Sequence, residues 1–212
     1  FNMIRKNFTF VITTFRSGAV IDECLKDMPK DIRKIIVENS NDHNLKDRLE
    51  NMYENTECFL MSDNLGYGKA NNFGIIKSNT DYVFILNPDT KITDEKFTKI
   101  VSLLQEQDFA IAAPQIVEKN IVYKQNKSDH QIKKVEHVFG MAMILNKRKF
   151  GNNFFDENIF LYHEEIDLCK RMINIGQNIL ELNIQLNHLG NQSHGGYDFE
   201  MEKSRNWHWM WS

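Results

Sequence analysis

The amino-acid sequence predicts an α/β protein whose mostly parallel central sheet is flanked by helices. Short β-branched and aromatic runs alternate with helix-compatible segments along most of the 212 residues, which is typical of a parallel sheet. The run Tyr-Val-Phe-Ile-Leu at residues 82–86 is all but entirely apolar, as expected of a central strand covered on both faces. The length fits one domain over residues 1–212, and an end within an aromatic cluster is compatible with a truncated C-terminus.

The composition is that of a protein with a buried hydrophobic core. Hydrophobic residues make up 42% and charged residues 26%, with a net charge of −3, which excludes a disordered chain and argues against a nucleic-acid partner. Cys24, Cys58 and Cys169 are far apart, which excludes a zinc module and fits a reducing compartment. No apolar run approaches the roughly 20 residues that cross a bilayer. We therefore expect a cytoplasmic protein.

The first half of the chain is expected to hold three strands and three helices. The expected strands are residues 8–13, 32–37 and 58–61. The expected helices are residues 18–28, 45–55 and 69–77. Pro29 ends the first helix, and the polar cluster that follows residue 37 is typical of a loop at the carboxyl end of a strand.

The second half continues the alternation. After the central strand at 82–86 we expect a helix at 97–106 and strands at 110–114 and 139–145, separated by a polar surface excursion over 118–134. A helix at 164–175 has an apolar stripe, and Gly176 lies where a C-cap glycine belongs.

Polar side chains follow three of the expected strands, where ligands bind in open α/β sheets. Taken singly, each is also compatible with ordinary turn chemistry. Together they form one candidate pocket rim: Thr13, Thr14, Glu38, Asn39, Asn87 and Asp89.

Asp89 is the strongest candidate for a functional residue on this rim. A carboxylate held just past a buried strand by Pro88 is well placed to bind a hard divalent cation. The alternative is an Asx-turn that closes the strand, because Asn-Pro-Asp-Thr is also an ordinary turn sequence.

Residues 64–72 read Asn-Leu-Gly-Tyr-Gly-Lys-Ala-Asn-Asn. Small residues, the basic Lys69 and a helix start are conditions under which backbone N–H groups approach an anion. The candidate binding residues here are Asn64, Gly66, Lys69 and Asn72. A tight turn explains the glycines equally well.

An acidic cluster opens the last expected helix. Glu164, Glu165 and Asp167 follow His163 directly; acids at a helix N-terminus complement the helix dipole and need no function. In the functional reading, one carboxylate is a general base that deprotonates an alcohol, while its neighbour binds the acceptor or holds the loop. Further on, His188 and His194 are candidate metal ligands.

Five motifs in order resemble the family 2 glycosyltransferases with their GT-A fold, particularly their rhamnosyltransferase-like branch. Residues 11–15 resemble the first strand of the family, 37–41 (Val-Glu-Asn-Ser-Asn) its Val-Asp-Asn-Ala-Ser turn, and 64–72 its Asn-Leu-Gly-Phe-Gly-x-x-Asn-Asn loop. Residues 86–90 (Leu-Asn-Pro-Asp-Thr) match a variant of its metal-binding aspartate motif. Residues 155–171 are similar to its Phe-Asp-Glu-x-Phe-Phe-x-Tyr-x-Glu-Asp-x-Asp-Leu-x-x-Arg segment.

The resemblance implies roles for individual residues. Thr13, Glu38 and Asn39 would meet the base and ribose of a nucleotide-diphospho-sugar, and Asp89 with His188 would bind Mg²⁺ or Mn²⁺. Glu38 stands where the family usually has aspartate, which keeps the carboxylate but lengthens its reach toward the nucleotide. Glu165 also stands where aspartate is usual, so the general base would be Glu165 or, in part, Glu164, and we favour Glu165.

The expected activity is inverting transfer of a sugar from dTDP-rhamnose or a UDP-sugar to a glycan or lipid-linked acceptor. A catalytically inactive nucleotide-sugar sensor or a scaffold of polysaccharide assembly is the alternative. Trp207, Trp209 and Trp211 suit peripheral membrane contact, or equally packing on the surface of the domain itself.

Overall fold

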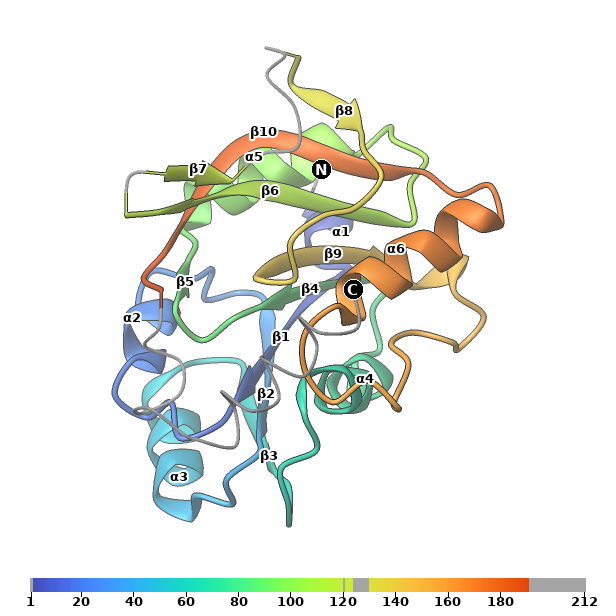
Figure 1. The fold of residues 1–212 in the computed structure, drawn as a ribbon. Coiled ribbons are helices and arrows are strands. Elements are labelled where there is room, and N and C mark those ends of the chain that lie inside the picture. Colours follow the sequence, from blue (N-terminus) through green and yellow to red (C-terminus); the bar gives the residue numbers. More distant parts are fainter. Residues whose placement is uncertain (1, 120, 124–129, 191–212) are drawn as a thin grey trace.

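The structure is a computed structural model that describes residues 2–119, 121–123 and 130–190. Its centre is one mixed sheet in the order β3-β2-β1-β4-β9-β6-β10-β5, with β7 beside β6 and β8 beside β10 (Figure 1). The strands are β1 (Phe8–Thr14), β2 (Arg33–Glu38), β3 (Thr56–Leu60), β4 (Tyr82–Leu86), β5 (Thr90–Lys91), β6 (Ile111–Glu118), β7 (Ile121–Tyr123), β8 (Ile132–Lys134), β9 (Ala142–Asn146) and β10 (Ile179–His188).

Most strands on the main path point the same way. β1 pairs parallel with β2 and β4, and β2 pairs parallel with β3. β9 is antiparallel to both β4 and β6, so β6 runs in the direction of β4, and β10 is parallel to β6. Only β9 and β5 run against the others on this path. The prediction of a mostly parallel sheet is confirmed.

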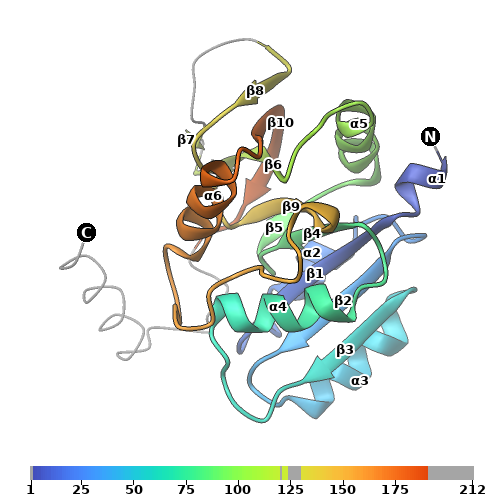
Figure 2. The ribbon, with the colours of Figure 1, turned by 90° about the vertical axis from the view of Figure 1, so that its right-hand side faces the viewer.

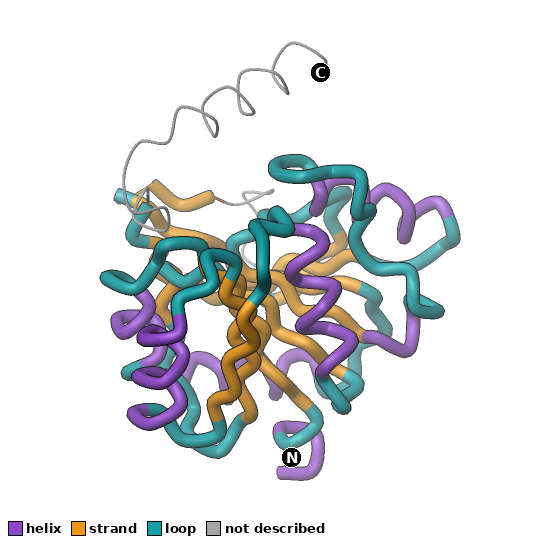
Figure 3. Tube along the Cα trace, turned by 90° about the horizontal axis from the view of Figure 1, so that it is seen from below, coloured by secondary structure: helices purple, strands orange, loops and turns teal. Residues whose placement is uncertain are grey.

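Helices cover both faces of the sheet (Figures 2 and 3). They are α1 (Asn2–Arg5), α2 (Ile21–Leu25), α3 (His43–Met52), α4 (Tyr67–Lys77), α5 (Asp94–Leu104) and α6 (Glu164–Asn174), with a short 3₁₀ turn η1 (Lys147–Lys149). Buried side chains of α2, α3 and α5 belong to one core cluster, and those of α4 and α6 to the other. Within the described residues, no helix has the length and apolar character needed to span a bilayer.

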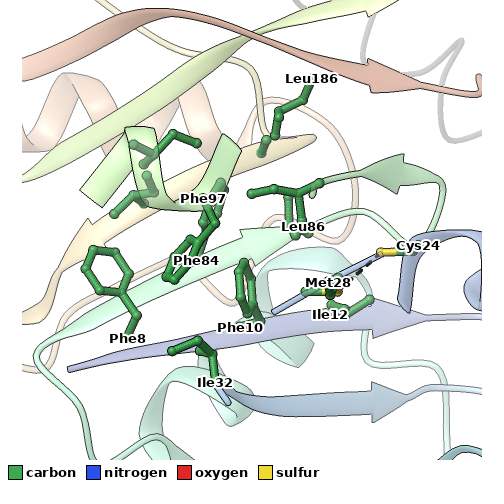
Figure 4. Close-up of a cluster of buried hydrophobic side chains, with 14 of the residues drawn as sticks. Phe8, Phe10, Ile12, Cys24, Met28, Ile32, Phe84, Leu86, Phe97 and Leu186 are labelled. Atoms are coloured by element: carbon green, nitrogen blue, oxygen red, sulfur yellow. Dashed lines mark hydrogen bonds between the residues drawn. The ribbon is translucent and has the colours of Figure 1, made fainter. Parts of the chain in front are cut away.

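Strand periodicity separates the two cores. Phe8, Phe10 and Ile12 of β1 enter one cluster, whereas Val11 enters the other, because successive side chains of a strand point to opposite faces. The ring of Phe10 lies 5.3 Å from that of Phe84 on β4 in the cluster that Figure 4 shows. This packing fixes the strands whose carboxyl ends carry the candidate site.

The sequence analysis assigned no strand to residues 179–188, yet β10 is the longest strand in the described part of the chain. Its signal was an alternation of apolar Leu180, Leu182, Ile184 and Leu186 with polar residues. The expected polar excursion over 118–134 also contains β7 and β8. The first helix, expected over 18–28, is confined to Ile21–Leu25.

Gly74 lets α4 lie directly on the sheet. A Cβ at this position would stand 2.4 Å from Cγ1 of Val11 and 3.2 Å from Cγ2 of Val37. Both neighbours are stiff, β-branched core residues, so neither can move away cheaply. The close approach fixes the position of the α4 N-terminus at the site.

We predict that Gly74→Ala destabilises the protein by about 1–3 kcal/mol through overpacking, although alanine favours a helix interior by about 1 kcal/mol. Gly18→Ala is the matched control, since its Cβ would meet nothing closer than 3.8 Å. Urea denaturation of both variants measures the effect. Equal stability of the two would contradict the role of Gly74.

Candidate functional site

Asp89 lies in the turn between β4 and β5, fully buried. The backbone N–H of Thr90 donates to the carbonyl of Asn87 at 3.0 Å, and the N–H of Asn87 donates to the carbonyl of Met141 at 3.0 Å. Among the described residues, neither carboxylate oxygen of Asp89 has a hydrogen-bond partner. The side chain therefore does not close an Asx-turn, and a buried carboxylate without donors calls for a cationic neighbour.

His188 is the side chain that lies beside this carboxylate. It is the last residue of β10 and pairs with Thr90 of β5, while the N–H of Leu189 donates to the carbonyl of Asp89 at 2.9 Å. Nε2 of His188 stands 3.1 Å from Oδ1 of Asp89, but without the geometry of a hydrogen bond. Nδ1 lies 3.0 Å from Oε2 of Glu118. Burial lowers the pKa of His188, and the carboxylates of Asp89 and Glu118 outweigh it, so the pKa is raised.

These atoms fit a divalent cation. Two ligands at about 2.1 Å in adjacent octahedral positions are about 3.0 Å apart, close to the 3.1 Å between Oδ1 and Nε2. The carboxylate oxygen suits Mg²⁺ or Mn²⁺, whereas the imidazole nitrogen is a ligand more typical of transition-metal ions. The described residues form no cluster of three or more such side chains able to hold a metal, so further ligands would come from water or a bound molecule.

The loop after β2 is closed by Glu38. Its fully buried carboxylate accepts from the backbone N–H groups of Ser40 and Asp42, at 3.0 and 2.8 Å, and from the Ser40 hydroxyl. Its contact with a nucleotide stays a prediction. The immediate role of this longer acid is to shape the turn.

Thr13 and Asn39 also lie at this rim. The Thr13 hydroxyl donates to Oδ1 of Asn71 at 3.2 Å. Nδ2 of Asn39 donates to the carbonyl of Gly66 at 3.4 Å, whereas its buried Oδ1 and the buried hydroxyl of Thr14 have no partner within the described part of the chain. A contact of either atom with a ligand stays a prediction.

The loop before α4 is tied to the segment before α6. Oδ1 of Asn64 accepts from the N–H of Gly66 at 3.0 Å, and the N–H of Tyr67 donates to the carbonyl of Phe160 at 3.0 Å. Gly66 has a φ of +77°, and a Cβ there would stand 2.3 Å from the Phe160 carbonyl oxygen. The first amide of α4 is therefore occupied, while Lys69 is exposed.

Asn72 binds the backbone of the neighbouring segment. Its Nδ2 donates to the carbonyl of Phe155 at 2.9 Å, and its Oδ1 accepts from the N–H of the same residue at 3.0 Å. These bonds hold the chain that leads to α6. Both polar atoms of the Asn72 amide are used in these bonds, so a direct contact of Asn72 with a nucleotide-sugar stays a prediction.

The acidic cluster opens α6 after two residues with strained backbone. Tyr162 and His163 have φ values of 70° and 71°, a conformation that costs non-glycine residues energy and often occurs at functional sites. Glu164 is buried, whereas Glu165 is half-buried. Burial raises the pKa of Glu164 to about 7 and also raises that of Glu165.

The segment before β9 lies next to both the turn that carries Asp89 and the Glu165 side chain of α6. The carbonyl of Met141 accepts from the N–H of Asn87 and from the Thr90 hydroxyl, at 3.0 and 3.3 Å. A Cβ on Gly140 would stand 3.7 Å from Cδ of Glu165. The turn that carries Asp89 thus contacts Met141, and the carboxylate of Glu165 lies beside the adjacent Gly140.

Asp167 has a local structural partner. Its Oδ2 accepts from Nε of Arg171 at 2.7 Å, and the same guanidinium donates to the carbonyl of Phe154 at 2.5 Å. The pair fixes the segment before α6 to the helix. A contact of Asp167 or His163 with an acceptor stays a prediction.

Glu118 is the residue that the sequence analysis missed, because it fell at the start of the expected excursion. Its signal was its position directly after the apolar run of β6, at the carboxyl end of a parallel strand. His194 and the three tryptophans lie outside the described residues.

The chain is similar to known glycosyltransferases. It is 24% identical over 200 residues to the low-salt glycan biosynthesis hexosyltransferase Agl10 of Haloferax volcanii, covering 81% of this chain and 64% of that protein. The chain thus spans less than two thirds of the length of this relative.

Solved structures share the fold. The crystal structure of GalNAc-T7 with UDP, GalNAc and Mn²⁺ has a TM-score of 0.70 at 11% identity, over 90% of this chain and 45% of that chain. S. aureus TarS 1–349 in complex with UDP has a TM-score of 0.71 at 16% identity, over 86% and 60%. The GT-A fold that the motifs imply is confirmed. Residues 9–173, well over half of the chain, match the sequence profile of glycosyl transferase family 2, so this chain belongs to that family.

Proposed function

We propose that this protein is an inverting, metal-dependent glycosyltransferase that moves a sugar from a nucleotide-diphospho-sugar to a hydroxyl of a glycan or lipid-linked acceptor. The observation that carries the proposal is the buried carboxylate of Asp89, which receives no hydrogen bond from the residues that the structure describes and faces Nε2 of His188. The UDP complexes of TarS and GalNAc-T7 and the hexosyltransferase name of Agl10 support a UDP-hexose donor. dTDP-rhamnose is the second donor to test.

Asp89 and His188 are the residues that would hold Mg²⁺ or Mn²⁺. When bound, such an ion supplies positive charge against the diphosphate that leaves. On the nucleotide side, the buried Oδ1 of Asn39 and the Thr14 hydroxyl lack a partner among the described residues, and the adjacent Thr13 hydroxyl donates to Asn71 and can still accept a hydrogen bond. The half-buried Asn87 of the candidate rim and the exposed Lys69 of α4 are further proposed contacts of the nucleotide-sugar.

Glu165 is the proposed general base. It accepts the proton of the acceptor hydroxyl as that oxygen bonds to the anomeric carbon, and the bond between this carbon and the diphosphate oxygen breaks on the opposite face. The configuration is thereby inverted without a covalent enzyme intermediate. Glu165 is preferred to Glu164 because Glu164 is only 2% exposed and packs against Gly68 of α4.

An inactive nucleotide-sugar sensor would keep the rim but need no base. The raised pKa of Glu165 favours the enzyme, since burial prepares a carboxylate to accept a proton. Donor binding without transfer or hydrolysis under Mg²⁺ or Mn²⁺, with a panel of UDP- and dTDP-sugars, would favour the sensor.

Asp89→Asn is predicted to abolish sugar transfer and to weaken Mn²⁺ binding strongly, because a neutral amide is a poor ligand for a hard cation. Asparagine keeps the size of the side chain, so the circular dichroism spectrum should be unchanged. Radiolabelled transfer and calorimetric Mn²⁺ titration measure the two effects. Near-normal activity of the variant, or full activity of the wild type in excess chelator, would overturn the metal role.

Glu165→Gln is predicted to lower turnover by about 10²–10⁴-fold while it still binds donor nucleotide. Glu164→Gln, the adjacent control, should keep substantial turnover. Since the base must be ionised, wild-type turnover should fall as the pH drops through a pKa raised above the ordinary 4.5. A dead Glu164→Gln beside an active Glu165→Gln would show that the neighbouring carboxylate is the base.

A further inference from the structure

Glu118 contacts the metal-ligand candidate His188 from the side opposite to Asp89. It ends β6, and β6 pairs in parallel with β10, the strand that ends in His188. Oε2 of Glu118 lies 3.0 Å from Nδ1 of His188. The side chains are only 19% and 9% exposed, so water competes little for this hydrogen bond.

This hydrogen bond determines which ring nitrogen can act as a ligand. A carboxylate can only accept, so Nδ1 must carry the hydrogen. In the neutral ring, Nε2 is then the atom with the lone pair, and Nε2 is the atom 3.1 Å from Oδ1 of Asp89. Glu118 thus selects the tautomer and the ring orientation that a metal site between His188 and Asp89 requires.

Gly190 packs against the same carboxylate. A Cβ at this position would stand 2.4 Å from Oε1 of Glu118, and φ is +66°. The chain that leaves β10 therefore turns closely around Glu118, which only glycine does without strain. One oxygen of the carboxylate faces the imidazole and the other faces this backbone, so its position is restricted on two sides.

We propose that Glu118 is a positioning residue that orients His188 and thereby sets the affinity of the divalent-cation site. The inference rests on the proposed function, because that function places a cation between Asp89 and His188. Carboxylates that hydrogen-bond a ligating histidine typically contribute 10–100-fold to metal affinity.

The test is a calorimetric titration of the whole chain with Mn²⁺ alone, at one fixed pH. Glu118→Ala is expected to weaken Mn²⁺ binding about 10–100-fold. Glu118→Gln keeps a carbonyl oxygen that accepts from Nδ1–H and should lose less. Glu106→Ala removes an exposed carboxylate and should match the wild type. Metal-free UDP binding and the circular dichroism spectrum should be unchanged in all three, which separates positioning from a general loss of structure.

The outcomes separate the two proposals. If Asp89→Asn loses Mn²⁺ while Glu118→Ala binds it like the wild type, the positioning role is wrong and the proposed metal site stands. If the wild type itself does not bind Mn²⁺, the proposed metal site and the positioning role of Glu118 are both wrong. Should Glu118→Ala fail to fold, Glu118→Gln decides: an affinity loss without a change in the circular dichroism spectrum supports positioning, and wild-type affinity overturns it.

Discussion

A buried carboxylate that no described residue supplies with a hydrogen bond is the constraint on which the site depends. Leaving such a charge uncompensated costs several kcal/mol, yet the fold excludes Asp89 fully from solvent. The pairing of β5 with β10 brings the imidazole of His188 to it from a distant part of the chain. The positions of β6 and β10 in the sheet therefore determine the site, because they place His188 between Asp89 and Glu118.

The second part of the site is held by backbone contacts between segments far apart in sequence. Asn72 binds both polar groups of the Phe155 backbone, and the Phe160 carbonyl accepts the first amide of α4. These contacts anchor the segment before α6, and the left-handed residues Tyr162 and His163 then turn the chain into the helix. The strain at this turn fixes where Glu164 and Glu165 begin to project.

Local patterns predicted the strand ends but not the partners of the side chains. The apolar runs predicted β1, β2 and β4, and the ends of these runs predicted that Thr13, Glu38 and Asp89 lie at the rim. β10 was missed because an alternating strand in a polar context gives a weaker signal than an apolar run, and Glu118 was missed because it fell at the start of the expected polar excursion. The bonds that occupy Glu38 and Asn72 could not be predicted, since they depend on turn geometry and on a segment distant in sequence.

The most direct test of the account is a crystal structure of this chain soaked with Mn²⁺ and UDP, with anomalous data collected for manganese. The account predicts one strong anomalous peak within about 2.0–2.3 Å of a carboxylate oxygen of Asp89 and of Nε2 of His188, with diphosphate oxygens completing the coordination. UDP bound at the rim with no manganese between these two side chains, or manganese bound elsewhere, would contradict it.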